Sequence, residues 1–487
     1  MASAGITATL SLWINRGLEL LWLLVVVLTP LAFLDRESIR SEAVIAYVEV
    51  PKITLLRTLV GLMSILWLLE WGIRGRLAVG GLFGPDIYRT RVLQLLTRLG
   101  DWLKARPSRW LFLAVWFFLG TTFLSTVLSG SFSTSLWGEV PGQDGYPAYT
   151  VIAYVLLFAV VATHLKTRAQ LWRLFGAIIV MGVLVSGYGV LQHYGHDFLD
   201  LTEITGGGQR QATSFMGNTI FAAAVMLMTI PISAAAAALS LRDPWSIAGG
   251  LHRRLNLWAF NLLLASVWGL VLAVQLLGIT FTLTRGPWIG TLVAMAVFLG
   301  LVLMFLGRYF LMRTLLPLGL AIAFILAVLL WQGSFSSVGS GGLLAVLAVL
   351  VGIGWVGLVM APWRIMRQVA LGLGLTLALG LTLMLAVIWF SGGNGASIGE
   401  PNPSAAPANP TATIALERFS SVKQQVVTGL GGRGTHWKVS WELIRDRPWF
   451  DFDDLSLSWL RPLIGYGPDL FRYTYLLRSP AEGISFL

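Results

Sequence analysis

From Asn218 to Ser240 the chain reads NTIFAAAVMLMTIPISAAAAALS, a run of 23 residues without a charged side chain. A helix that crosses the hydrocarbon core of a bilayer needs roughly 20 mostly apolar residues. This run meets that length, and so do about ten further runs elsewhere in the chain. They cover residues 10–34, 53–72, 110–130, 147–164, 174–192, 257–278, 288–307, 314–331, 342–361 and 368–390. The sequence therefore predicts an all-α polytopic membrane protein with about eleven transmembrane helices.

The composition agrees with a membrane protein. Of the 487 residues, 56% are hydrophobic and only 12% are charged, whereas soluble proteins carry about 25% charged residues. The absence of cysteine excludes disulfides, thiolate metal ligands and thiol nucleophiles. The five histidines are scattered without the spacing of metal ligands. We therefore predict neither a metal site nor a cofactor.

The basic residues predict the orientation of the chain in the membrane. With a cytoplasmic N-terminus, the inner loops hold 18 Lys and Arg residues and the short outer loops hold 5, as the positive-inside rule requires. Arg16 and Glu19 interrupt the first apolar run, which argues against a cleaved signal peptide. The formal charge of +11 is thus a topology signal, and no nucleic-acid partner is predicted. In the most basic loop, 73–109, apolar residues around 92–103 leave open an amphipathic helix on anionic lipid.

The chain divides into two regions of different character. Residues 1–390 form the predicted transmembrane helical domain, and residues 391–487 form an extracytoplasmic loop domain. That loop opens with a Gly/Pro-rich linker at 391–410 and continues with two helix-like pieces near 414–427 and 435–445. It reaches Leu487 on the outer side without a closing span, so we expect C-terminal spans beyond this chain.

Three polar patches fall on the predicted outer face. The first patch, RQATSFMGNTIFA at 210–222, enters a span with one arginine, hydroxyls and Asn218. The second, FTLTRGPWIG at 281–290, places Thr284 and Arg285 at the start of the next-but-one span. Arginines beside helix N-termini suit a diphosphate, because guanidinium groups and free backbone N–H groups both bind phosphate oxygens. The third patch covers 433–471 and includes these residues: Arg433, His436, Trp437 and Tyr466.

These patches resemble the motifs of the O-antigen ligase and O-antigen polymerase superfamily of bacterial membrane glycosyltransferases. RQATSFMGN resembles the family's Arg…Thr-Phe-Gly-Asn-Pro-Asn segment, and TLTRGPWIG resembles its Thr-x-Ser-Arg-Gly-Ala-x-x-Gly segment. Residues 433–471 resemble its Arg…Trp…Arg-Pro…Gly-x-Gly-x-x-x-Phe segment, which lies in a large periplasmic loop. The resemblance covers roughly 190–487. The chain departs from the family at Thr219-Ile220, where Pro-Asn is common, at Pro287, and in the added stretch 449–461.

The resemblance implies a function. Such enzymes sit in the bacterial cytoplasmic membrane and transfer a glycan from a polyprenyl-diphosphate carrier to an acceptor hydroxyl of a glycan, lipid or protein on the outer face. It assigns Arg210, Arg285 and Arg433 to the diphosphate, without a metal. The family's His-Asn element would lie beyond Leu487, so His436 is only a candidate base. Four residues are expected to bind substrate: Asn218, Thr284, Trp437 and Tyr466.

Two other functions stay open at this point. A glycosyltransferase that uses a polyprenyl-monophosphate sugar would need an acidic metal site, for which Asp35–Glu37 and Asp451–Asp454 are candidates. A transporter or lipid-glycan flippase would place ionisable residues near mid-membrane. The few charges inside apolar runs all fall within the first two spans: Arg16, Glu19, Arg57 and Glu70.

Overall fold

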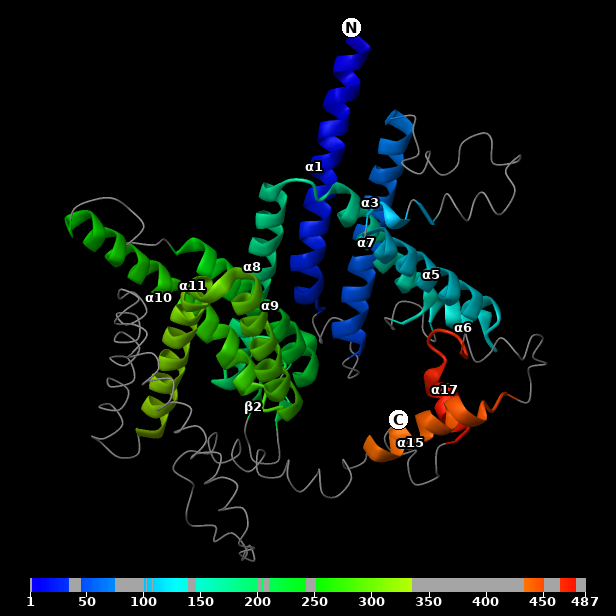
Figure 1. Cartoon of the computed structure of the whole chain (residues 1–487). Coiled ribbons are helices and arrows are strands. Elements are labelled where there is room, and N and C mark those ends of the chain that lie inside the picture. Colours follow the sequence, from blue (N-terminus) through cyan, green and yellow to red (C-terminus); the bar gives the residue numbers. More distant parts are fainter. Residues whose placement is uncertain are drawn as a thin grey trace, which may run out of the picture. The chain divides into compact units, whose positions relative to one another are not determined.

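The computed structural model (Figure 1) describes most of the chain before residue 335 and two segments after it. The described residues are 2–34, 45–74, 100–101, 103–106, 108–138, 146–199, 201, 203–204, 210–241, 251–334, 433–450 and 465–478. They form two compact units, residues 1–177 with 430–487 and residues 178–429. The boundaries predicted for the two domains, at 390 and 391–410, lie outside the described residues.

The described secondary structure is helical apart from one pair of two-residue strands. Unit 1 contains α1 (Ala2–Leu31), the π-helix η1 (Ile45–Glu49), α3 (Val50–Arg74), α5 (Ser108–Val127), α6 (Phe132–Trp137), α7 (Ala148–His164), α15 (Arg433–Asp446) and α17 (Phe471–Leu476). Helix α8 (Arg168–His193) continues into unit 2. Unit 2 further contains β1 (Glu203–Ile204), β2 (Arg210–Gln211), the 3-10 helix η3 (Ser214–Met216), α9 (Thr219–Ser240), α10 (Leu251–Phe281) and α11 (Arg285–Ser334).

Within the described residues, seven helices are long and apolar enough to cross a membrane. They cover Thr9–Leu31, Tyr47–Ile73, Arg109–Val127, Arg168–His193, Thr219–Ser240, Ala259–Phe281 and Gly286–Gly307. Two more predicted spans correspond to shorter apolar helices, Ala148–His164 and Tyr309–Ile325. The remaining two, 342–361 and 368–390, lie outside the described residues. In lipid only a helix satisfies every backbone polar group internally, which explains why these apolar runs form helices.

The predicted loop at 308–313 is instead helical. Helix α11 runs from Arg285 to Ser334, and its regular geometry is interrupted at Gly307 (φ 81°, ψ 172°). Glycine tolerates this backbone conformation because it has no Cβ. The two apolar halves of α11 therefore meet at one residue rather than at a six-residue loop.

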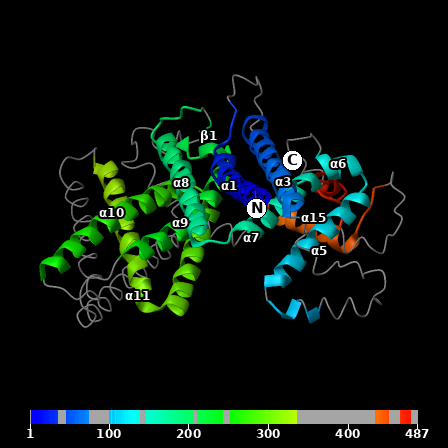
Figure 2. The ribbon, with the colours of Figure 1, turned by 90° about the horizontal axis from the view of Figure 1, so that it is seen from above.

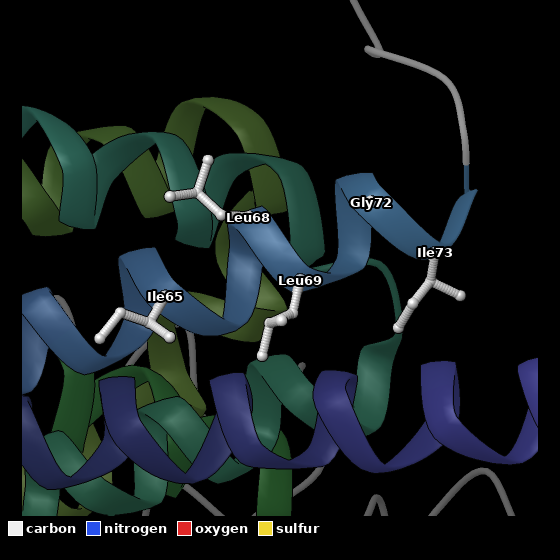
Figure 3. A pocket seen from close by; sticks show the side chains of 5 residues that line it. All are labelled: Ile65, Leu68, Leu69, Gly72 and Ile73. Carbon is white, nitrogen blue, oxygen red and sulfur yellow. The ribbon is translucent and has the colours of Figure 1, made fainter.

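Unit 1 is built around α1, α3 and α7. Helices α1 and α3 lie side by side in Figures 1 and 2, and both contact α7. Their shared core includes Leu18, Trp22, Met63 and Val160, all almost fully buried. One shallow groove of about 410 Å³ lies on α3 and is lined by Ile65, Leu68, Leu69, Gly72 and Ile73 (Figure 3). It presents only apolar side chains, so we do not assign chemistry to it.

The acidic residues in the first two spans are paired. Glu70 Oε2 lies 2.6 Å from His164 Nε2, and both side chains are buried. On α1, Glu19 Oε1 accepts a 2.6 Å hydrogen bond from Arg173 Nε. These contacts join α3 to α7 and α1 to α8, so the structure gives both carboxylates a role in helix packing.

Small residues allow the helices of unit 2 to approach closely, as is common between membrane helices. In Figure 2, α9, α10 and α11 are the neighbouring green helices, and each contacts the other two. A Cβ added at Gly278 of α10 would lie 2.9 Å from the Cβ of Ser186 in α8. At Gly182 of α8 it would lie 2.6 Å from the Cβ of Thr229 in α9. These glycines set the distances between α8 and its neighbours.

Replacing Gly182 with alanine is expected to destabilise unit 2. The added Cβ would lie 2.4 Å from Thr229 Oγ1 and 2.6 Å from Thr229 Cβ, so rotation of that side chain alone does not relieve the overlap. Overpacking of this kind costs about 1–3 kcal/mol. The control is Gly176→Ala on the same helix, where nothing lies within 4 Å. Alanine favours a helix more than glycine does. Thermal unfolding in detergent should therefore give a lower midpoint for Gly182→Ala only. Equal midpoints would contradict the proposed packing.

Candidate functional site

The first two sequence patches lie against each other in unit 2. The backbone N–H of Ala212 donates a 3.0 Å hydrogen bond to the carbonyl of Phe281. The ring of His193, at the end of α8, stacks on Phe281 with centroids 3.9 Å apart and planes 6° apart. The structure therefore connects the turn that follows Arg210 with the turn that precedes Arg285.

Two predicted site residues of unit 2 are defined by their backbone. Arg210 lies in β2, opposite Ile204 of β1, and Arg285 is the first residue of α11. Their side chains lie outside the described part of the structure. Ala212 follows Arg210 by two residues and Phe281 precedes Arg285 by four, so the hydrogen bond between Ala212 and Phe281 joins the segments that carry the two arginines.

Asn218 and Thr284 are each engaged in local hydrogen bonds. Asn218 is the N-cap of α9, and its Oδ1 accepts a 2.8 Å bond from the N–H of Ile220. This is the usual way in which a capping side chain satisfies a free N–H at a helix start. The hydroxyls of Thr284 and Thr282 lie 2.9 Å apart. Between them Leu283 is fully buried and has a positive φ of 53°.

A buried polar network supports the turn at 213–214. Ser214 has a positive φ of 49° and is fully buried. Its N–H donates to Gln192 Oε1 at 2.6 Å, and its hydroxyl donates to the carbonyl of Val185 at 2.7 Å. The neighbouring hydroxyl of Thr213 donates to the carbonyl of Leu201. A serine in a rare backbone conformation persists only when its surroundings hold it there, and these bonds from α8 and the following loop do so.

Asp197 is a carboxylate of this network that the sequence patterns did not identify. It accepts hydrogen bonds from the hydroxyl of Tyr188 and from Gln192 Nε2, at 2.5 and 3.1 Å. The ring of Tyr188 stacks on Phe215, with centroids 4.7 Å apart. A signal in the sequence could have indicated this contact. Tyr188 and Gln192 are four residues apart, so both lie on one face of a helix, and a loop with acidic residues follows them. Asp197 thus holds the side chain of Gln192, which in turn accepts the hydrogen bond from the N–H of Ser214.

Replacing Gln192 with alanine is expected to loosen the Arg210 turn. The change leaves the buried N–H of Ser214 without its acceptor, which costs about 1–3 kcal/mol. Hydrogen exchange at 210–218 should accelerate, and the thermal midpoint should fall. The control is His196→Ala, an exposed residue four positions along the chain. Unchanged exchange in Gln192→Ala would show that this network does not hold the turn.

Two helices begin directly after the joined turns. Helix α9 begins at Thr219 directly after the first turn, and α11 begins at Arg285 directly after the second. The first N–H groups of a helix lack intrahelical acceptors, and the helix dipole adds partial positive charge there. Each helix start favours an anion. The junction therefore combines two such starts with two arginines, an arrangement that suits an extended anion such as a diphosphate.

The third patch belongs to unit 1. Arg433 is the first residue of α15, and its side chain lies outside the described part of the structure. His436 Nδ1 lies 2.6 Å from the hydroxyl of Tyr475 in α17. Val439, Leu443 and Tyr475 form a small buried core between the two helices. The structure does not place Arg433 relative to the arginines of unit 2.

The two aromatic residues predicted to bind substrate in this patch differ in their surroundings. Tyr466 donates a 2.7 Å hydrogen bond to the carbonyl of Pro448. Its ring stacks on Trp449, with centroids 5.3 Å apart. Trp437 is 62% exposed on the surface of α15. Tyr466 thus holds the segment at 465–469 against residues 448 and 449. The ring of Trp437 is exposed and can contact another molecule.

The end of α15 carries a paired carboxylate. Asp446 accepts a 2.7 Å hydrogen bond from Arg445 and faces Arg478 at 3.7 Å. The hydrogen bond from Arg445 is the main reason that the pKa of Asp446 is lowered. Asp446 is thereby held as an anion and is a poor candidate for a base.

The described residues bring no group of three or more His, Asp or Glu side chains together as metal ligands. The acidic stretches Asp35–Glu37 and Asp451–Asp454 lie outside the described residues. No family model matches the chain, and neither a curated protein nor a solved structure matches it. The class follows from the helices: seven of them are able to cross a bilayer, so the chain is a multi-pass helical membrane protein.

Proposed function

We propose that the chain is a membrane glycosyltransferase of the O-antigen ligase or polymerase type. It transfers a glycan from a polyprenyl-diphosphate carrier to an acceptor hydroxyl on the outer face of the bacterial cytoplasmic membrane. The observation that carries the proposal is the hydrogen bond between Ala212 and Phe281, which joins two arginine-bearing turns at two helix N-termini. The sequence resemblance described above supplies the reaction.

The reaction requires charge stabilisation and a base. The acceptor oxygen forms a bond to the anomeric carbon of the donor glycan, and the bond from that carbon to the diphosphate oxygen breaks. The diphosphate leaves with the electron pair, and the acceptor proton passes to a base. Groups aimed at the charge that develops on the leaving diphosphate lower the barrier. We assign this task to Arg210, Arg285 and the starts of α9 and α11.

The residues of the third patch extend this proposal. Arg433 is proposed to contribute to diphosphate binding and His436 to serve as the base, with Trp437 as an exposed ring against which a sugar can stack. The hydrogen bond between His436 Nδ1 and Tyr475 fixes the orientation of the imidazole, which a base requires. When Nδ1 carries the proton, the lone pair on Nε2 is available to accept another.

Three features of the membrane arrangement belong to the same proposal. The N-terminus is cytoplasmic, about eleven spans cross the membrane, and 391–487 lies on the periplasmic side. The ends of α9 and α11 that carry the joined turns then face outward. The supporting observation is the distribution of Lys and Arg between alternate loops, 18 against 5.

A reconstituted assay tests the function. The protein is placed in liposomes with a fluorescent oligosaccharide on polyprenyl diphosphate, and separate samples contain a glycan, a lipid A core or a peptide acceptor. We expect a glycan-linked product that is formed equally well in EDTA. Activity that is lost in EDTA and restored by a divalent cation would favour the polyprenyl-monophosphate type. Movement of the intact donor between leaflets without product would identify a flippase.

A further inference from the structure

Arg57 lies inside an apolar helix of unit 1 and has no carboxylate partner among the described residues. It belongs to the candidate span Tyr47–Ile73. Its Nε and Nη2 donate to the hydroxyl of Thr150 at 3.1 and 2.6 Å. Other charged side chains of these spans also have partners: Glu19 pairs with Arg173 and Glu70 contacts His164. Lys52 donates hydrogen bonds to the carbonyls of Ala32 and Val48. A charge within a membrane span is costly and marks a functional site by default.

The depth of Arg57 places it near one membrane boundary. It follows Tyr47, the first residue of the candidate span, by ten residues, or about 15 Å along a helix, and its hydrogen bond to Thr150 places its guanidinium level with the start of α7. Its partner Thr150 is the third residue of α7. The buried pair of Glu70 and His164 lies toward the opposite ends of the same two helices. Arg57 is thus within one or two turns of the boundary at which α7 begins.

The surroundings of Arg57 orient its guanidinium group. The group lies over the ring of Tyr149, 4.7 Å from its centroid. That ring is packed in turn against Trp137 of α6, with centroids 5.4 Å apart. The ring and the hydroxyl fix the plane of the guanidinium, and the N–H groups that do not face Thr150 stay available.

We propose that Arg57 binds the phosphate group of an anionic lipid. A phosphate offers paired oxygens that match the guanidinium fork, and a lipid phosphate already lies at the depth of a helix end. The lipid phosphate would supply the negative charge opposite Arg57, since no carboxylate of the described residues does so. Leu68, which follows Arg57 by about three helical turns on the same face of α3 and is exposed, is positioned to contact the acyl chains. This site is separate from the joined turns and does not depend on the glycosyltransferase proposal.

Lipid binding to the purified full chain tests this assignment. Native mass spectrometry in detergent compares phosphatidylglycerol with phosphatidylcholine, and inorganic phosphate is added in a parallel sample. We expect a preference for phosphatidylglycerol of about tenfold or more, as one strong charged pair provides. Arg57→Ala should remove the preference, and Thr150→Val should reduce it several-fold by releasing the guanidinium.

The control is Arg16→Ala. Arg16 also lies beside an aromatic ring in the first spans, with its guanidinium 5.8 Å from the centroid of Trp13, and this variant should keep the preference. If Arg57→Ala does not fold, Thr150→Val still provides the test. A preference that persists in both variants would overturn the proposal and leave Arg57 with a packing role. Displacement of the lipid by inorganic phosphate at comparable concentration would overturn the assignment to a lipid.

Discussion

Replacing Arg285 with alanine is expected to abolish glycan transfer while leaving folding and membrane insertion intact. Arg285 opens α11 directly after a turn whose position is fixed by the bond from Ala212 to Phe281. Loss of one preorganised group that stabilises charge in a transition state costs about 100- to 1,000-fold in rate. The loss should appear in the turnover rate of the liposome assay, with the thermal midpoint unchanged.

Two matched variants sharpen this test. Arg285→Lys keeps the charge but not the planar fork, so we expect partial activity. Arg313→Ala removes a partly buried arginine from the second half of the same helix, where its guanidinium lies 4.6 Å from the centroid of the Tyr309 ring, and this variant should transfer glycan normally. Wild-type rates in Arg285→Ala would refute the assignment of this residue to the diphosphate.

Replacing Gly467 with alanine is expected to detach the turn at 465–469 from α6 and from the turn that precedes it. Gly467 has a φ of 118°, which disfavours any side chain. An added Cβ would also lie 2.6 Å from Ser129 Cβ and 2.6 Å from Ser135 Oγ. Ser135 is fully buried and has no room to yield. Hydrogen exchange at 465–478 should accelerate strongly.

The same variant should affect transfer if the third patch acts in catalysis. A displacement of about 1 Å in a positioning segment costs on the order of 100-fold in rate, so we expect a loss of that size. The control is Gly465→Ala, where φ is 70° but nothing lies within 4 Å, and only mild backbone strain is introduced. Faster exchange with normal transfer would show that the third patch packs against α6 and the turn before it without serving the reaction.

Apolar patterning was sufficient to predict the helical class. The run at 218–240 became α9 almost residue for residue, and α15 matches the helix-like piece predicted near 435–445. The prediction of a loop at 308–313 was wrong. Hydropathy shows where polar side chains lie, but it does not show whether the backbone there is helical. Two basic residues mark the stretch as polar, yet the chain changes direction at Gly307 alone.

The contacts that organise the candidate site were less accessible to sequence reasoning. The patches at 210–222 and 281–290 were recognised separately, by their arginines and helix starts. The main-chain bond from Ala212 to Phe281 joins residues 69 positions apart, and backbone groups leave no trace in side-chain patterns. Asp197 was missed for a related reason: a single acid in a loop acquires meaning only from the folded positions of Tyr188 and Gln192.

The bond between Ala212 and Phe281 also bears on how such a protein diverges. Both partners are peptide groups, so mutation at either position leaves the tether in place unless position 212 becomes proline, which has no N–H to donate. Side chains of the two turns that are not buried can then change to suit another ligand, while the hydrogen bond between the turns is kept. A main-chain hydrogen bond of this kind keeps the two turns together, while selection can act on their exposed side chains.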